Sequence, residues 1–479
     1  MFVSVNKLKS FRPVLPIGMV TVATQVRAAG HDVHVLDLMW EEEDEKAVRE
    51  AVAAFRPDVV GISIRNVDSQ NMLEPVIYTP LAREVADWAR AERPGVTVVL
   101  GGPGFSTVPD DLMDFVGAEY GITGFAEESM VPFLAHLRDG TEPADVPGVI
   151  FRAPDGSYHR RDPVFEIDYR KAARPDPELY DPRYFTYSYE THDRSEKVPA
   201  TIQTKKGCVL ECVFCSNFLV DGTGVKFDDV KRVADEVERL RDEGLEVLEI
   251  VDGVFNLPLN YAVEVLREFV RRGIEMPWSC MINPGNVTPE LVDLMVRTGC
   301  YYVEFGTDSC NDRVLRRLKK NFRQRQVISA HRRFEQAGIR VEHCLFIGSP
   351  GDDRDSVRET FDVMSGLVPP RPTPTGPSAC ACAAGPPCTP PPSRRACSPA
   401  TSGSSCPSTT CPGTSSRTAP SSTRSRSGCW PTTTGTCGGA CAPSACASAS
   451  AWRARRASGS RPSSSPICPS AAPRTCPSP

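Results

Sequence analysis

The stretch "TKKGCVLECVFCSNF", residues 204–218, places three cysteines within eight positions, after 207 residues that contain none. Cys208, Cys212 and Cys215 are spaced C-x3-C-x2-C, and the aromatic Phe214 directly precedes the last of them. Thiolates at this spacing bind a soft metal ion or an iron–sulfur cluster. Zinc fingers usually use two separated cysteine pairs, and the first 368 residues contain no second pair. Three protein ligands around a four-iron cluster leave one iron open to an exogenous ligand.

The residues around the cysteines predict a series of strands and helices. "PATIQT" (199–204) is a strand that leads into the cysteine loop, and "FDDVKRVADEVERLRDEG" (227–244) has the apolar spacing of a helix. Further strands are predicted at 246–256, 276–283, 300–309 and 339–350. Five such βα units over residues 199–368 predict an open or partial barrel, with its chemistry at the carboxyl ends of the strands.

Residues 1–150 predict a separate α/β domain. Val- and Ile-rich strands at 1–6, 31–38, 57–65, 96–102 and 118–124 alternate with helices, which is typical of a doubly wound parallel sheet covered on both faces. Ligands of such sheets bind outside the carboxyl ends of the strands. Those ends carry Asn6, Ser63, Arg65, Asn66, Gly101, Gly102 and Thr123. Residues 151–198 then predict a short hairpin and a proline-marked linker.

The charge balance separates the last part of the chain from the rest. All 60 Asp and Glu precede Pro369, and 11 of the 55 Lys and Arg follow it, so the body has a net charge of −16 and the tail +11. An acidic body argues against a nucleic-acid partner. The sequence shows neither a membrane span nor a signal peptide, which predicts a cytoplasmic protein whose body cysteines bind metal or are buried thiols.

Residues 369–479 carry 12 of the 19 cysteines among Pro, Ser, Thr, Ala, Arg and Gly. A disordered low-complexity tail is one interpretation, and a cysteine-rich scaffold is a second. A third hypothesis is favoured here: except for Ile467, every tail residue has a codon with G or C in the second position. In a GC-rich gene the third base of each codon is almost always G or C. A shift of the reading frame by one base would move these bases to the second codon position. A one-base frameshift near codons 368–371 explains the pattern, and resequencing the locus tests it.

The cysteine loop resembles that of the radical S-adenosylmethionine (SAM) superfamily, and the preceding domain resembles the cobalamin-binding domain of cobalamin-dependent radical SAM enzymes. The resemblance covers residues 1–365 and includes "VDGVFN" (251–256), "EFGTDS" (304–309) and "GSPGDD" (348–353). It implies a 4Fe-4S cluster on the three cysteines, SAM on the open iron, and cobalamin in the first domain. It also implies SAM-binding roles for Phe214, Asp252, Asp308, Gly348 and Gly351. Asp308 departs from the glutamate more usual in this family.

One motif of other cobalamin proteins is missing. The D-x-H-x-x-G sequence that supplies a histidine to cobalt is absent, because Asp32-x-His34 lacks the glycine, and His34 is interpreted as an ordinary strand residue. Arg65 or Asn66 is the candidate for the lower side of the corrin ring, with hydrogen bonding at the sheet edge as the alternative. The methylthiotransferase branch is disfavoured because its N-terminal domain has cluster cysteines of its own. Cys280, Cys300, Cys310 and Cys344 are interpreted as small buried hydrophobes.

The resemblance implies reductive cleavage of SAM, hydrogen abstraction from substrate, and methyl transfer from methylcobalamin to an unactivated carbon or phosphorus centre. The expected substrate is a small natural-product intermediate of the kind used in antibiotic biosynthesis, with phosphinate P-methylation in a phosphinothricin-type pathway as the specific candidate. The expected partner is an electron donor such as flavodoxin or ferredoxin. A cobalamin-dependent cyclase or rearrangement enzyme, a radical SAM enzyme without cobalamin, and a non-catalytic cobalamin sensor stay open as alternatives.

Overall fold

The computed structural model describes residues 1–8, 13–69, 75–190, 195–368 and 381–383. Residues 1–386 form one compact unit, and the remainder of the tail lies outside the described residues, so the frameshift hypothesis stays a prediction. No described helix is long and apolar enough to cross a membrane.

The strands are β1 (Phe2–Ser4), β2 (Val35–Asp37), β3 (Val59–Ser63), β4 (Thr97–Gly101), β5 (Tyr120–Ile122), β6 (Val149–Arg152), β7 (Tyr158–Arg160), β8 (Ser188–Glu190), β9 (Ser195–Lys197), β10 (Ala200–Ile202), β11 (Lys205–Lys206), β12 (Lys226–Phe227), β13 (Leu248–Ile250), β14 (Trp278–Ile282), β15 (Cys300–Asp308), β16 (Arg340–Ile347) and β17 (Ala381–Ala383).

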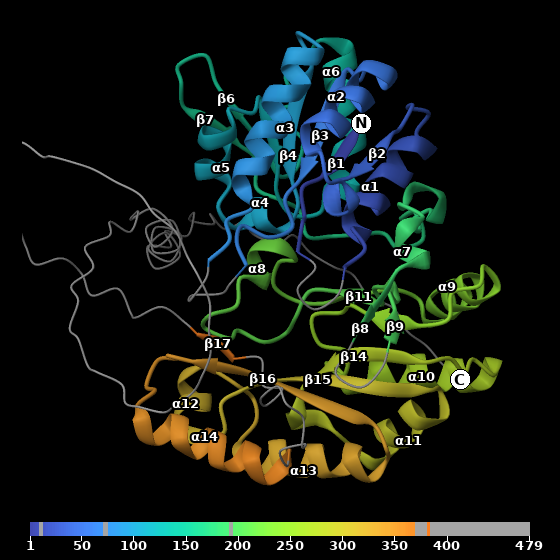
Figure 1. The fold of residues 1–479 in the computed structure, drawn as a ribbon, viewed down its shortest axis with the longest axis vertical. Helices are drawn as coiled ribbons and strands as arrows, with labels where there is room; N and C mark the ends of the chain where they lie inside the picture. The colour runs from blue at the N-terminus through green and yellow to red at the C-terminus, as the bar shows by residue number, and fades with distance from the viewer. Residues whose placement is uncertain (9–12, 70–74, 191–194, 369–380, 384–479) are drawn as a thin grey trace, which may run out of the picture. The chain divides into compact units, whose positions relative to one another are not determined.

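The longer helices cover these strands, and short turns of helix connect them (Figure 1). The α-helices are α1 (Ile17–Ala28), α2 (Asp44–Phe55), α3 (Thr79–Glu92), α4 (Pro103–Thr107), α5 (Pro109–Val116), α6 (Ala126–Asp139), α7 (Arg183–Thr186), α8 (Asn217–Val220), α9 (Val230–Asp242), α10 (Leu259–Arg272), α11 (Pro289–Arg297), α12 (Asp312–Arg317), α13 (Gln324–Gln336) and α14 (Arg354–Leu367). Helices α4 and α5 are absent from the prediction. Both begin with a proline, which is favoured at the first position of a helix because its missing N–H is not needed there.

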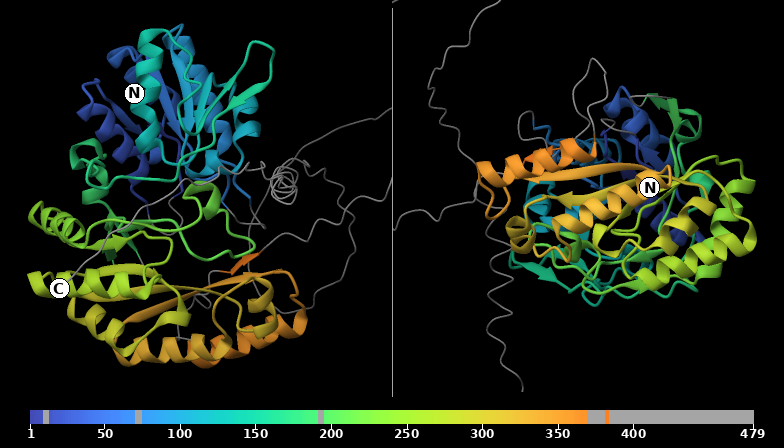
Figure 2. Two further views of the ribbon diagram at one scale, coloured as in Figure 1. Left: turned by 180° about the vertical axis from the view of Figure 1, so that it is seen from behind. Right: turned by 90° about the horizontal axis from the view of Figure 1, so that it is seen from below.

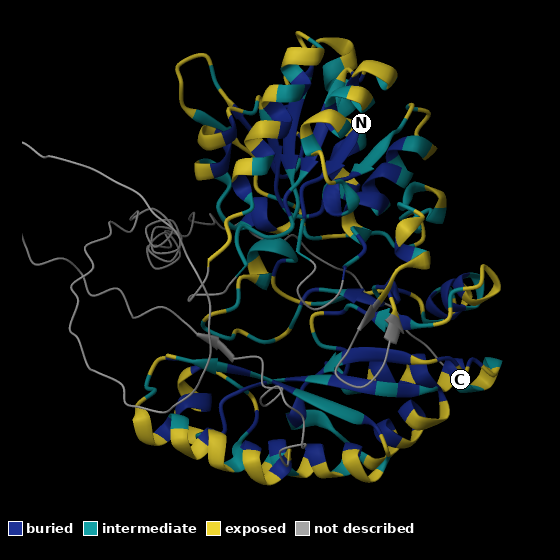
Figure 3. Ribbon diagram, in the orientation of Figure 1, coloured by how far each residue is buried: buried dark blue, intermediate teal, exposed yellow. Residues whose placement is uncertain are grey.

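The first sheet has seven strands in the order β2-β1-β3-β4-β5-β6-β7, of which β2 to β5 are parallel. One face packs against α1 and α6, and the other against α2, α3 and α5, which confirms the predicted doubly wound domain. The predicted hairpin is β6–β7, and it continues this sheet because β6 pairs antiparallel with β5. In Figure 3 the strands are mostly buried while the outer sides of the helices are exposed.

The second sheet has six parallel strands in the order β10-β13-β14-β15-β16-β17. Helices α9 to α13 pack on one face of β10 to β16 through alternate strand residues, and α14 extends this layer beside β16. Figure 2 shows this layer from behind and from below. The five predicted strands are present. A sixth, β17, pairs with β16 inside the segment whose composition predicts disorder, and backbone pairing at an open sheet edge explains how a sequence without strand character forms it.

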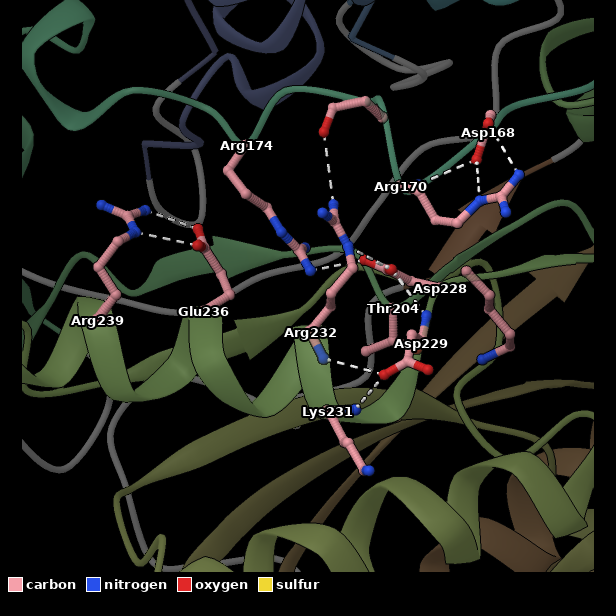
Figure 4. A network of polar contacts seen from close by, with 12 residues as sticks. Asp168, Arg170, Arg174, Thr204, Asp228, Asp229, Lys231, Arg232, Glu236 and Arg239 are labelled. Atoms are coloured by element: carbon pink, nitrogen blue, oxygen red, sulfur yellow. Dashed lines mark hydrogen bonds and ion pairs between the residues drawn. The ribbon is translucent and has the colours of Figure 1, made fainter.

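Polar contacts fix α9 to the linker that precedes the barrel (Figure 4). Asp229 is the N-cap of α9, and its carboxylate accepts hydrogen bonds from the backbone N–H of Lys231 and Arg232. The fully buried side chain of Asp228 contacts two guanidinium groups, those of Arg232 and of Arg174 in the linker. The linker is therefore held against the start of the helix that follows the cysteine loop.

A buried histidine pair between β16 and α13 predicts acid sensitivity. The His343 Nδ1 lies 2.8 Å from the Thr307 hydroxyl, and its Nε2 lies 2.9 Å from the His331 Nδ1. Burial, and then the neighbouring His331, lower the pKa of His343 from 6.5 to about 3. Below pH 6.5 the unfolded chain takes up a proton that the folded chain does not, so His343 lowers the free energy of unfolding as the pH falls from 6.5 towards 3. The slope for one such group is at most about 1.4 kcal/mol per pH unit.

We expect His343→Asn to make this dependence shallower. Urea unfolding at several values between about pH 7 and pH 5 measures the slope for both proteins. Carboxylates that titrate in the same range contribute equally to both, so the difference between the slopes isolates the histidine. Equal slopes would contradict the assignment.

Candidate functional site

The turn that leads into the cysteine loop is anchored on Asp252, which follows β13. Both oxygens of this buried carboxylate accept hydrogen bonds, from the Thr204 N–H (2.7 Å) and hydroxyl (2.6 Å) and from the Lys205 N–H (3.2 Å) and Nζ (2.5 Å). Lys205 is itself 1% exposed and also donates to the Phe255 carbonyl. With four donors, the carboxylate has little capacity left for the expected contact with SAM. We propose instead that Asp252 positions the cysteine loop.

The three cysteines follow this anchor and are half-buried free thiols, whereas Cys280, Cys300 and Cys310 are buried as predicted. Cys344 is half-buried as well, so its interpretation as a buried hydrophobe is wrong: it lies in β16, the strand beside the edge strand β17 of the second sheet. Sulfur atoms of the loop accept backbone hydrogen bonds, Cys208 from Leu210 and Cys215 from Asn217. Burial raises the pKa of the Cys208 and Cys212 thiols, and a bound cationic iron centre would favour their thiolate forms.

The donor set of the loop matches what an iron–sulfur cluster takes. Cys208, Cys212 and Cys215 offer three soft sulfur ligands within eight residues. A four-iron cluster takes its thiolates at separate corners. The donor set therefore fits the 4Fe-4S cluster expected from the sequence, and Cys208, Cys212 and Cys215 are the residues that would hold it.

Two of the expected SAM residues meet beside the cysteines through a lysine that sequence reasoning missed. Asp308, the last residue of β15, is 8% exposed and adopts a φ of +58°, which is rare for a residue other than glycine. Its carboxylate lies 2.5 Å from the Lys320 Nζ, and this ammonium lies 5.3 Å from the centre of the Phe214 ring. Burial raises the pKa of Asp308, and Lys320 opposes that rise. Lys320 lies in the loop after α12, outside the helices and strands, so the hydrophobic periodicity of the sequence gives no sign of its role.

The expected glycine turn after β16 is built around Asp352. Gly348 and Gly351 have φ values of +89° and +91°, which residues with a Cβ rarely adopt. The Asp352 carboxylate accepts hydrogen bonds from the backbone N–H of Gly348 (3.0 Å) and Ser349 (2.9 Å). The two glycines thus form a tight turn at the carboxyl end of the strand, and their contact with SAM stays a prediction.

The structure gathers the expected cobalamin residues along one edge of the first sheet. Ser63 is paired in register with Ser4 and with Gly101, so β1, β3 and β4 end side by side. A Cβ on Gly101 would approach no described atom closer than 3.8 Å, so the fold itself does not demand glycine there and a ligand can approach the backbone. Four of the other expected residues follow the ends of the same strands, and Thr123 follows the next strand, β5: the four are Asn6, Arg65, Asn66 and Gly102.

Two of these residues already take part in the fold. The Thr123 hydroxyl donates to the Gly148 carbonyl at 3.1 Å, and a Cβ on Gly102 would lie 2.7 Å from the Ile64 carbonyl oxygen. His34 lies just before β2, at the amino end of that strand, and its ring is 5.6 Å from Phe55. The cobalamin-binding edge is at the opposite end of the strands, which agrees with the interpretation of His34 as an ordinary residue.

Comparison with known protein families finds a match for each of the two domains. The B12 binding domain family matches residues 4–134, and the Radical SAM superfamily matches residues 202–364. The tryptophan 2-C-methyltransferase of Streptomyces laurentii is 26% identical over 423 residues, which cover 76% of this chain and 70% of the relative. The chain belongs to the cobalamin-dependent radical SAM enzymes.

Further relatives of this radical SAM enzyme include methyltransferases and a cyclase, the anaerobic magnesium-protoporphyrin IX monomethyl ester cyclase of Rubrivivax gelatinosus, which is 24% identical over 72% of this chain and 61% of the relative. The cytidylyl-2-hydroxyethylphosphonate methyltransferase of Streptomyces wedmorensis is 24% identical, over 73% of this chain and 72% of the relative. The solved structure of the radical SAM methyltransferase TsrM from Kitasatospora setae, with tryptophan and a SAM analogue bound, aligns with a TM-score of 0.68 and 25% identity. That alignment covers 77% of this chain and 71% of TsrM. The cofactors of this enzyme are therefore a 4Fe-4S cluster, SAM and cobalamin.

The glycine before the first ligand offers a test of the cysteine loop. Gly207 has a φ of +89°, and a Cβ there would lie 2.0 Å from the Gly224 carbonyl oxygen. We expect Gly207→Ala to displace Cys208 and to remove most of the iron bound after anaerobic reconstitution. Gly244→Ala is the matched control, because Gly244 has the same φ with nothing within 4 Å. That change costs about 1 kcal/mol of backbone strain and should leave the iron content unchanged. Equal iron loss in both variants would contradict the prediction.

Proposed function

We propose that this enzyme transfers a methyl group to an unactivated carbon or phosphorus centre of a small natural-product intermediate in the cytoplasm, with electrons from a flavodoxin or ferredoxin. The observation that carries the proposal is the half-buried cysteine loop after the first strand of the second sheet, in a chain whose first sheet presents a cobalamin-type edge. A non-catalytic cobalamin sensor has no use for such a loop.

When bound, the cluster and SAM supply radical chemistry, and cobalamin supplies the methyl group. The described residues hold and orient these groups. Asp252 and Lys205 fix the turn before Cys208. The buried Lys320 places a positive charge beside Asp308 and the Phe214 ring, close to where SAM would meet the cluster. The polar ends of β1, β3 and β4 provide hydrogen-bonding groups at the cobalamin edge.

Two acceptor classes follow from the relatives. Phosphinate P-methylation is supported by the phosphonate methyltransferase relative, and methylation of a carbon in an amine-bearing molecule is supported by the tryptophan methyltransferase relative. Both relatives have nearly the same identity to this chain, so identity alone does not choose between them.

The test uses the reconstituted full chain with SAM labelled by a trideuteromethyl group, and with tryptophan and cytidylyl-2-hydroxyethylphosphonate as candidate acceptors. Mass spectrometry measures 5′-deoxyadenosine and the label in products. Label in a product supports methyl transfer. Unlabelled product with 5′-deoxyadenosine indicates a cyclase or rearrangement. A protein that binds corrinoid but yields neither 5′-deoxyadenosine nor labelled product with any acceptor is the sensor.

A further inference from the structure

Two consecutive lysines precede the cysteine loop, and they contact different parts of the chain. Lys205 and Lys206 form β11, and successive residues of a strand point to opposite faces. Lys205 pairs with Asp252, which follows β13 in the second domain. Lys206 pairs with Glu127, which lies in the first turn of α6 in the first domain. The start of the cysteine loop is therefore joined to both domains.

The pair between Lys206 and Glu127 is buried. The two side chains are 13% and 7% exposed, and the Lys206 Nζ lies 4.5 Å from the centre of the buried Phe125 ring. Burial raises the pKa of Asp221, and the Lys206 ammonium opposes that rise, so a second carboxylate lies near the same lysine. Charges that are removed from water are stable only beside their partners, which distinguishes this pair from the loosely held ion pairs of a protein surface.

An aromatic side chain packs tightly beside the pair. Phe165 follows the β6–β7 hairpin and meets Phe125 edge-on, with 5.6 Å between the ring centres. A Cβ on Gly124, which follows β5 in the first domain, would lie 3.1 Å from the Phe165 ring, and a Cβ on Gly222, which follows α8 in the second domain, would collide with the same ring. Both glycines have positive φ values. Phe165 therefore fills the space between one turn of each domain.

The other flank of the cysteine loop also contacts the first domain. Helix α8 begins shortly after Cys215 and contacts α4 (Figure 1). Helix α4 follows β4, and α6, which carries Glu127, follows β5. The carboxyl ends of these two strands belong to the edge that carries the expected cobalamin residues. The cysteine loop is thus held on both flanks by helices that begin at the cobalamin edge.

We propose that Lys206 is a positioning residue, and that its buried pair with Glu127 sets the separation between the corrinoid and the 4Fe-4S cluster. Reacting groups must meet within about 3–3.5 Å, and a displacement of about 1 Å costs on the order of 100-fold in rate. A contact that joins the entry of the cluster loop to the cobalamin edge controls this separation directly. The inference concerns the two cofactors and does not depend on the identity of the methyl acceptor.

The experiment measures the distance between the two cofactors in the reconstituted full chain. Cobalt(II) in the corrinoid and the reduced cluster are both paramagnetic, so pulsed electron paramagnetic resonance gives the distribution of distances between them. We expect one narrow distribution in the wild type. It should become at least about two-fold broader in Lys206→Met and in Glu127→Gln, because domains without a fixed contact move relative to one another. Lys231→Met, which changes an exposed lysine of α9, should keep the wild-type distribution.

The double variant Lys206→Met/Glu127→Gln distinguishes positioning from stability. It leaves neither charge of the pair unpartnered, so it should resist urea better than Lys206→Met. Its distance distribution should nevertheless stay broad, because the pair is still missing. A double variant with the narrow wild-type distribution overturns the inference, since the separation would then not depend on the pair. If the double variant does not fold, Glu127→Gln decides in the same way.

A broad distribution in the wild type also overturns the inference, because no contact would then fix the separation. Iron, corrinoid and 5′-deoxyadenosine are measured in the same samples. If these are normal while the variants keep the wild-type distribution, only this inference fails. If the wild type binds no corrinoid, this inference and the proposed function fail together.

Discussion

Replacing Cys212 with alanine should abolish SAM cleavage. The loop offers three thiols as the proposed ligands of the cluster. None of the buried cysteines can take the place of one of them, because Cys280, Cys300 and Cys310 lie inside packed cores. Two thiolates hold a four-iron cluster poorly, so the iron and sulfide content after reconstitution should fall to a small fraction of the wild-type value. The broad absorption that cysteine-bound iron produces should fall with it. The yield of 5′-deoxyadenosine should fall by at least about 1,000-fold, since the reaction depends on the cluster.

The matched control is Cys344→Ala, which removes a half-buried thiol of the same sheet that belongs to no cluster motif. It should retain iron, sulfide and SAM cleavage. Cobalamin binding, measured by the corrinoid spectrum, should be normal in both variants because the first sheet is untouched. A Cys212→Ala protein that keeps its full iron content and activity would show that the loop is not the cluster site.

Replacing Lys205 with methionine should strongly destabilise the second domain. The ion pair between Lys205 and Asp252 is almost completely buried, with 1% and 0% of the two side chains exposed. Removing the ammonium leaves a buried carboxylate with only the donors of the turn. The loss of one partner from a buried pair costs about 3–5 kcal/mol of unfolding free energy. We also expect a lower iron content, because the same contacts hold the turn before Cys208.

The double variant Lys205→Met/Asp252→Leu separates charge from packing. It removes both charges together, so it should be less destabilised than the sum of the single changes. Asp139→Asn is the surface control: its ion pair with Arg138 is exposed and should have no measurable effect. Urea unfolding measures the wild type, the single variants Lys205→Met and Asp252→Leu, the double variant and Asp139→Asn. A Lys205→Met protein as stable as the wild type would contradict the role assigned to the pair.

The local pattern of the chain was enough to predict most of its fold. Val- and Ile-rich strands between amphipathic helices indicate parallel sheets, and the structure confirms parallel strand pairing in both domains. Helices cover both faces of the first sheet but one face of the second. The short helices α4 and α5 and the edge strand β17 escaped prediction. Helix α4 is only five residues long and β17 depends on backbone pairing, so neither has a hydrophobic period to read. Helix α5 does bury one face, through Leu112, Met113 and Val116, and its apolar spacing was overlooked. The cysteine motif needs only eight consecutive residues, so the sequence alone could name it.

The tertiary structure decided what lies around that motif. Residues far apart in sequence meet there: Lys205 with Asp252, Asp308 with Lys320, and Thr201 with Glu249. Their pairing is set by strand order and register, which no local pattern encodes. The sequence thus determined the fold class and predicted the cluster ligands, because both rest on short-range spacing. Only the tertiary structure could show that Asp252 is buried against Lys205, because burial and opposing charge arise between segments that are far apart in the sequence.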